Sequence, residues 1–157
     1  MKANTISEIK KELKFYSKEE LFAIIHRLSR FKKENKELLT YLLFEANNED
    51  GHIEKVKEYM DLQFAEINTS SYYFIKKSVR KILSEVKKQI RFSQNKESEI
   101  ALLLYFCTKL KAMKPSYKGN TVLSNSFNNQ LRMIKTKLAK LHEDLQYDYL
   151  EELGELQ

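Results

Sequence analysis

The scarcity of glycine and proline constrains this chain more than any other feature of its sequence. The 157 residues include 3 glycines and 1 proline, whereas average usage of about 12% for the two together would give roughly 19. Tight turns, β-hairpins and glycine-rich phosphate loops all depend on these two residues. A β-sandwich, a barrel, a P-loop enzyme and a dinucleotide-binding fold therefore fit poorly. The sequence predicts an all-α protein with few, short connections.

The length favours one domain over residues 1–157, and such a domain can bury a core without disulfides. The only cysteine, Cys107, excludes an internal disulfide. The longest apolar run, Ile100–Cys107, is far shorter than the roughly 20 residues that span a bilayer. No apolar signal region follows the first residues. We therefore expect a soluble, cytoplasmic protein that does not bind membranes.

Apolar residues recur at helical spacing in about seven segments. Thr5 and Glu8, and likewise Ser17 and Glu20, have capping-box spacing and mark the first two helix starts. The other predicted helices cover roughly 33–46, 50–64, 72–91, 95–113 and 121–154. Together they predict antiparallel helix pairs followed by a long C-terminal helix.

The last predicted helix, 121–154, carries apolar residues spaced alternately by four and three. They are Phe127, Leu131, Ile134, Leu138, Leu141 and Leu145. This heptad seam lasts less than three heptads, so it indicates packing inside a bundle rather than a free coiled coil. Gly154 is a candidate C-cap for this helix.

Two stretches of the sequence echo each other. Residues 20–46 can be laid over 81–107 so that Leu21 meets Ile82 and Ile25 meets Val86. One interpretation is a repeated helix pair, 17–47 and 78–113, stacked as a short α-solenoid of HEAT-like character. The other is an irregular helical bundle, because any two amphipathic helix pairs can be slid into apolar register.

Candidates for catalysis are few. Glu49 and His52 have the spacing of paired metal ligands, but Gly51 lies between them and indicates a turn, so we expect no metal site there. Cys107 lies well inside a predicted helix and is interpreted as a buried structural residue. No Walker, nucleophile-elbow or paired-cysteine motif occurs. The sequence thus predicts neither an enzyme nor a cofactor.

The charge pattern is the one feature above background. Residues 76–91 contain seven Lys or Arg against one Glu, so their net charge is 7 − 1 = +6. Helical spacing places these seven opposite the apolar face of their helix, where they form a basic stripe. The basic stripe consists of Lys76, Lys77, Arg80, Lys81, Lys87, Lys88 and Arg91.

Residues 143–157, the acidic tail, carry six Asp or Glu and no Lys or Arg. Residues 1–142 therefore hold 28 − 16 = +12 against −6 in the tail. Acids near a helix C-terminus oppose the macrodipole. The basic stripe, in the same molecule or in a second copy, is a candidate to neutralise them.

Three interpretations of the basic stripe remain open. The first is a solvated face that maintains solubility. The second is a contact for an acidic protein surface. The third is a contact for nucleic-acid phosphates, with Tyr72 and Tyr73 stacking on bases. We predict a non-catalytic protein–protein interaction module, with a non-specific nucleic-acid binder as the alternative. The sequence leaves a homo-oligomer open.

Overall fold

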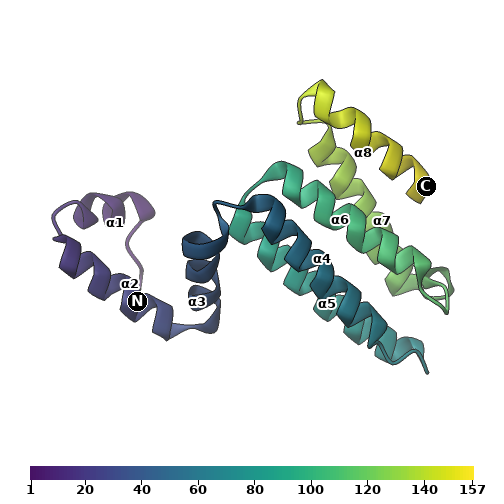
Figure 1. Ribbon diagram of the computed structural model, residues 1–157. Coiled ribbons are helices and arrows are strands. Elements are labelled where there is room, and N and C mark those ends of the chain that lie inside the picture. The colour runs from purple at the N-terminus through teal and green to yellow at the C-terminus, as the bar shows by residue number, and fades with distance from the viewer. The chain divides into compact units, whose positions relative to one another are not determined.

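Helices form the whole secondary structure of this chain. The computed structural model describes all residues from 1 to 157 and contains no strand (Figure 1). A π-helical turn, η1 (Tyr41–Glu45), and a 3₁₀ turn, η2 (Tyr117–Gly119), lie between longer helices. The α-helices are α1 (Ile6–Leu13), α2 (Lys18–Phe31), α3 (Lys33–Thr40), α4 (Glu49–Ala65), α5 (Tyr72–Ser93), α6 (Lys96–Ala112), α7 (Thr121–Leu138) and α8 (Glu143–Leu156). The predicted all-α class is confirmed.

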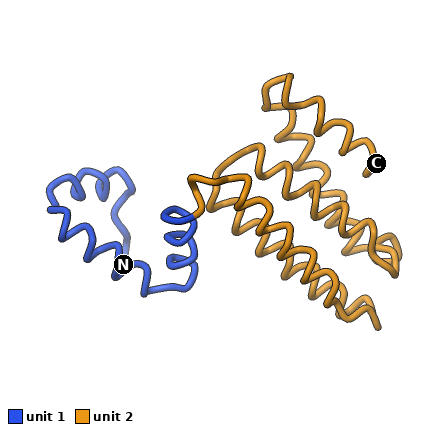
Figure 2. The backbone as a smooth tube through the Cα atoms, viewed as in Figure 1, with its two compact units in different colours: residues 1–44 blue, residues 45–157 orange.

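Contacts divide the chain into two compact units, residues 1–44 (unit 1) and residues 45–157 (unit 2) (Figure 2). The length alone favours one domain, and the division follows from where apolar side chains are buried. All members of the hydrophobic core cluster belong to unit 2. No side chain of α1, α2 or α3 is buried, so these three helices enclose no core.

The helix starts in unit 1 lie where the sequence predicts them. The Thr5 hydroxyl accepts from the Glu8 amide at 3.3 Å, and the Glu8 carboxylate accepts from the Thr5 amide at 2.7 Å. Ser17 and Glu20 make the same reciprocal pair at 3.1 and 2.8 Å. Each pair satisfies backbone N–H groups that the first helical turn leaves without a partner. Helix α2 ends where Lys32 adopts an extended backbone, and α3 packs against α2.

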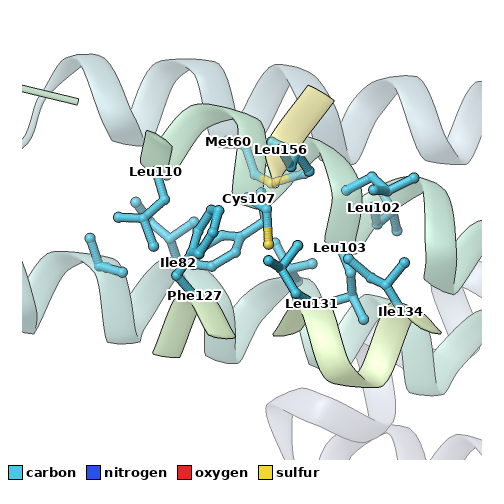
Figure 3. Packing of buried hydrophobic residues seen from close by; sticks show 14 of the residues in the cluster. Met60, Ile82, Leu102, Leu103, Cys107, Leu110, Phe127, Leu131, Ile134 and Leu156 are labelled. Atoms are coloured by element: carbon cyan, nitrogen blue, oxygen red, sulfur yellow. The ribbon is translucent and has the colours of Figure 1, made fainter. Parts of the chain in front are cut away.

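Helix α6 lies at the centre of unit 2. It packs against α4, α5, α7 and α8, and Figure 3 shows side chains of neighbouring helices gathered around its own. Leu102, Leu103 and Leu104 are all buried. Because consecutive residues point about 100° apart on a helix, three buried in a row mean that several sides of α6 are covered. The core of unit 2 is therefore built around this one helix.

Residues 121–154 form two helices where the sequence predicts one, and this part of the prediction is corrected. Helix α7 ends at Leu138 and α8 begins at Glu143. His142 caps α8, since its Nδ1 accepts from the Asp144 amide at 3.3 Å. Leu138 is buried and Leu141 packs against the same core. Leu145, the last residue of the heptad seam, is 42% exposed, so the packed part of the seam ends in the connection, although its spacing in the sequence does not reveal the break.

The break changes the environment of the acidic tail. Glu143 and Asp144 lie in the first turn of α8, where the helix macrodipole favours negative charge. Gly154, the proposed C-cap, lies inside α8, which continues to Leu156. Only the acids of the last turns therefore oppose the dipole.

The two echoing segments, 17–47 and 78–113, each contain a break between two helices. In the first, Lys32 is extended. In the second, Gln94 is left-handed with a φ of 53°. Their burial differs, because α2 and α3 bury nothing whereas α5 and α6 supply much of the core. The helix-pair repeat and its HEAT-like stacking remain predictions.

The N-cap of α7 is expected to contribute measurably to stability. The Asn120 Oδ1 accepts from the amides of Val122 and Leu123 at 3.0 and 3.2 Å. Asn120→Ala removes both bonds and should lower the free energy of unfolding by about 1 kcal/mol, within a range of 0.5–2. Urea denaturation followed by circular dichroism measures this change. Asn128→Ala, at an exposed position inside α7, is the control and should not destabilise the chain. Equal effects of both substitutions would contradict the capping role.

Candidate interaction surface

Helix α5 positions the basic stripe. It is the longest helix, with 22 residues, and is therefore about 33 Å long. One side carries Ile75, Val79, Ile82 and Val86, all buried, and packs against α4 and α6. Apolar residues at this spacing fix the rotation of the helix about its axis, so the opposite side is directed away from the core.

The seven cations of the basic stripe differ in their surroundings. Lys88 is paired with Glu85 at 2.8 Å, and its side chain is only 14% exposed. The ammonium of Lys77 lies 5.5 Å from the centre of the Tyr73 ring. Lys76 and Lys87 are half-buried, while Arg80, Lys81 and Arg91 are exposed. The stripe is therefore one continuous side of α5 with its exposed charges at 77, 80, 81 and 91.

Most of the positive charge of the stripe has no neutralising partner within the chain. No carboxylate lies within ion-pair distance of Arg80, Lys81, Lys87 or Arg91. From Arg80 to Arg91 these charges extend over about 16 Å of helix. Charges of one sign on one face, without ion-pair partners, create a potential that attracts polyanions and acidic surfaces.

The acidic tail packs elsewhere. Helix α8 contacts α6 and α7 and buries Leu153 and Leu156. The Lys111 ammonium donates to the Glu155 carbonyl at 2.7 Å, and the Tyr149 hydroxyl donates to the Glu97 carboxylate at 2.9 Å. No ion pair joins an acid of α8 to Arg80, Lys81, Lys87 or Arg91. The suggestion that the tail covers the stripe within one molecule is therefore corrected, because the apolar side of α8 holds it on α6.

The two tyrosines proposed to stack on bases have separate environments. The Tyr72 hydroxyl donates to the Ser116 carbonyl at 2.8 Å, and its ring packs against the core. Gly119 allows this arrangement, because a Cβ there would collide with the Tyr72 hydroxyl. Tyr73 is exposed and meets the edge of Phe74 with ring centres 5.4 Å apart. Only Tyr73 is available beside the stripe.

The polar cluster around His52 is structural in character. His52 is buried, and its Nδ1 lies 2.6 Å from Glu45 Oε2, while the Lys55 ammonium donates to Glu45 Oε1 at 3.0 Å. Burial acts to raise the pKa of Glu45, but the hydrogen bonds from Lys55 and His52 outweigh it and lower that pKa. These three residues help line a cavity of about 210 Å³ beside α4 and α5.

The prediction that a turn separates Glu49 from His52 is wrong. Helix α4 begins at Glu49, so both residues lie in its first turn, with Gly51 between them. The Ser98 hydroxyl donates to Glu49 at 2.6 Å, and His52 Nδ1 lies 2.6 Å from Glu45. No group of three His, Cys, Asp or Glu side chains gathers as a ligand set anywhere in the chain.

Cys107 has the surroundings of a core residue. It is fully buried on α6, and burial raises the pKa of its thiol to about 12. A nucleophilic cysteine needs a lowered pKa and access to solvent. The interpretation of Cys107 as a buried residue is confirmed.

A second surface, the apolar groove of unit 1, was not identified from the sequence. Helices α2 and α3, together with η1, form a groove of about 210 Å³ lined by Ile25, Leu28, Ser29, Asn35, Leu38, Leu39 and Leu42. Helical spacing assigns these apolar residues to an inner face but does not say what covers it. The signal in the sequence is the shortness of the three helices, because a segment this small encloses little core of its own.

Comparison with other proteins offers no guide to either surface. No helix of the structure combines the length and apolar character needed to cross a membrane. Family models, curated proteins and solved structures give no match to this chain. The basic stripe and the apolar groove are therefore assessed from their own chemistry.

Proposed function

We propose that this chain is a non-catalytic interaction protein whose basic stripe binds an acidic surface on a partner protein. The observation that carries the proposal is the run of unneutralised cations from Arg80 to Arg91 on one rigid helix. Arginine presents a planar fork of donors that can bind a carboxylate through two hydrogen bonds. Arg80 and Arg91 stand about 16 Å apart along α5, which suits acidic side chains spread along a partner helix or strand.

The packing of α5 supports this proposal. Its core-facing side is anchored by Ile75, Val79, Ile82 and Val86, so binding at the opposite side requires no rearrangement of unit 2. Complementary charge on a preformed surface mainly increases the rate of association and excludes partners of like charge. The stripe is accordingly proposed to select an acidic partner and to bind it reversibly.

Non-specific nucleic-acid binding is the alternative. The same unneutralised cations support it, and Tyr73 is exposed beside them. Tyr72, by contrast, is engaged with Ser116, so stacking on two adjacent rings is not available. A protein partner is favoured on this ground.

The test compares a stripe variant with a charge-matched control. The stripe variant carries Arg80→Glu, Lys81→Glu and Arg91→Glu, all at exposed positions of α5. The control carries Arg132→Glu, Lys135→Glu and Lys140→Glu, which are also exposed and change the net charge equally. The probes are a labelled polyglutamate peptide, duplex DNA and RNA, each at about 50 and 200 mM salt.

The parent chain is expected to bind polyglutamate, and the stripe variant to bind it at least about tenfold more weakly, or about 1.4 kcal/mol. The control should change the affinity by about twofold, since distant exposed charges are screened by salt. Tighter binding to DNA or RNA, with a logarithmic salt slope of about −0.9 per phosphate contact, would support the alternative. Failure to bind any probe at low salt, or equal loss in both variants, would contradict a function based on the stripe.

A further inference from the structure

Helix α8 is the only α-helix of the chain that contains no lysine or arginine. It buries Leu153 and Leu156 in the core of unit 2. Helical spacing places four of its six acids on the opposite side, and we call these four the acidic row. The acidic row consists of Asp144, Asp148, Glu151 and Glu155, all exposed.

The acidic row has almost no neutralising partner within the chain. No Lys or Arg lies within ion-pair distance of any acid of α8, and only Asp144 has a basic neighbour, the His142 imidazole at 3.4 Å. Like charges four residues apart on a helix repel each other, as Glu151 and Glu155 do here. A cationic surface laid along the row would relieve this repulsion.

The basic stripe and the acidic row match in spacing. Arg80, Lys87 and Arg91 share one side of α5, at offsets of 0, 7 and 11 residues from Arg80. The acidic row has offsets of 0, 4, 7 and 11 residues from Asp144. Both sets therefore extend over about 16 Å of helix. Since the offsets of the acidic row are the same from either end, the three cations meet three acids whether the two helices run parallel or antiparallel.

The charge of unit 2 is separated rather than uniformly positive. Unit 2 holds 18 Lys or Arg and 16 Asp or Glu, a net charge of 18 − 16 = +2, although residues 76–91 carry +6 and residues 143–157 carry −6. Helix α6 lies between α5 and α8 and packs against both (Figure 1). The charged side of each outer helix lies opposite its buried side, so two copies placed head to tail bring opposite charges together.

We propose that the basic stripe of one chain binds the acidic row of a second copy. The inference rests on the proposed function, because it names the acidic partner that the stripe binds. Each chain carries one stripe and one row on different helices, so the contact is heterologous and continues beyond a dimer. Exposed ion pairs are individually weak, and the association is therefore reversible and sensitive to salt.

The experiment follows the mass of the full chain by sedimentation velocity between about 10 and 500 μM, a range suited to weak association. At about 10 mM salt, the weight-average mass of the parent chain is expected to rise with concentration above the protomer mass of 18.7 kDa. At about 150 mM salt, the dissociation constant should increase at least about tenfold, because the Debye length falls from about 30 to about 8 Å.

Two variants each reverse one surface. The stripe-reversed variant carries Arg80→Glu and Arg91→Glu, and the row-reversed variant carries Asp144→Lys and Glu155→Lys. Each variant alone should have a dissociation constant at least about tenfold above that of the parent, because like charges then face each other. An equimolar mixture should return to within about threefold of the parent value, since the reversed positions are complementary in either helix direction.

Charge-matched controls separate this contact from the effect of net charge. Arg132→Glu with Lys135→Glu, and Glu58→Lys with Glu66→Lys, change exposed positions of unit 2 away from both surfaces. Each pair of substitutions should leave the dissociation constant within about threefold of the parent value. Circular dichroism of every variant should show the helical content and unfolding transition of the parent.

Several results would overturn the proposal: a parent chain that stays monomeric at low salt, association that salt and both reversals leave unchanged, or a mixture of the two variants that stays dissociated. Its failure is distinguishable from that of the proposed function. Polyglutamate binding to the stripe of a monomeric parent chain would retain the proposed function and exclude the second copy as the partner. A parent chain that neither binds polyglutamate nor associates would contradict both.

Discussion

Replacement of Phe106 by alanine is expected to lower the free energy of unfolding by about 3–5 kcal/mol. Phe106 is fully buried on α6, and its ring packs against that of Phe64 with centres 5.8 Å apart. Removal of the ring exchanges these contacts for a cavity that the surrounding helices cannot close, because α6 is held from several sides. A typical domain is stable by about 5–15 kcal/mol, so this one change removes a large fraction of the total.

Urea denaturation followed by far-ultraviolet circular dichroism measures this loss, with the midpoint and the slope fitted separately. Phe74→Ala is the matched control. Phe74 belongs to the same unit but is 43% exposed, so its removal should cost about 1 kcal/mol or less. Equal losses for the two variants would mean that α6 is not the centre of the core.

The second large expected effect concerns the reactivity of Cys107. Burial raises the pKa of its thiol to about 12 from an ordinary value of 9.0. Because the thiolate is the reacting species, a rise of about three pKa units lowers its population at pH 8 about 1000-fold. We therefore expect iodoacetamide to modify the native chain at least about 1000-fold more slowly than the urea-unfolded chain. The measurement is the pseudo-first-order rate by mass spectrometry.

The pH dependence supplies an independent readout. In the native chain the rate should keep rising about tenfold per pH unit up to pH 10, whereas an ordinary thiol levels off near its own pKa. The same pKa shift makes the free energy of unfolding depend on pH, because the unfolded chain loses the thiol proton at a lower pH than the native chain. The contribution of Cys107 is fully present below about pH 9 and is lost as the pH rises towards 12.

A variant with an accessible thiol on the same helix provides the control for Cys107. Cys107→Ala combined with Ala112→Cys places the thiol at an exposed position near the end of α6. That thiol should react at a similar rate in the native and unfolded chains. A native Cys107 that reacts as quickly would contradict its burial.

Much of the fold could be predicted from local patterns. Glycine and proline scarcity excludes sheet-rich folds, and the reciprocal pairs at Thr5 and Ser17 mark helix starts, because both signals act within a few residues. The buried side of α5 also follows from its sequence, since its apolar residues recur at helical spacing. The basic stripe is located by the same pattern. Its lack of neutralising partners could not be predicted, because that depends on where the acids of other helices lie.

The division into two units and the break before α8 depend on packing between distant residues. The apolar residues of α2 and α5 recur at similar helical spacing, yet Ile75, Val79, Ile82 and Val86 of α5 are buried and no side chain of α2 is. Periodicity shows which side of a helix is apolar but not whether anything covers it. The break between α7 and α8 is likewise accompanied by the burial of Leu153 and Leu156, far along the chain from the connection itself.

The central place of α6 has a consequence for how unit 2 is made in the cell. During synthesis α6 is complete before any residue of α7 or α8 exists, although both pack against it. At about 5–20 residues per second, the 45 residues that follow Ala112 take roughly 2–9 seconds to translate. For that interval leucines destined for the core of unit 2 lack their final neighbours. Apolar surface exposed in this way makes an incomplete chain prone to aggregation.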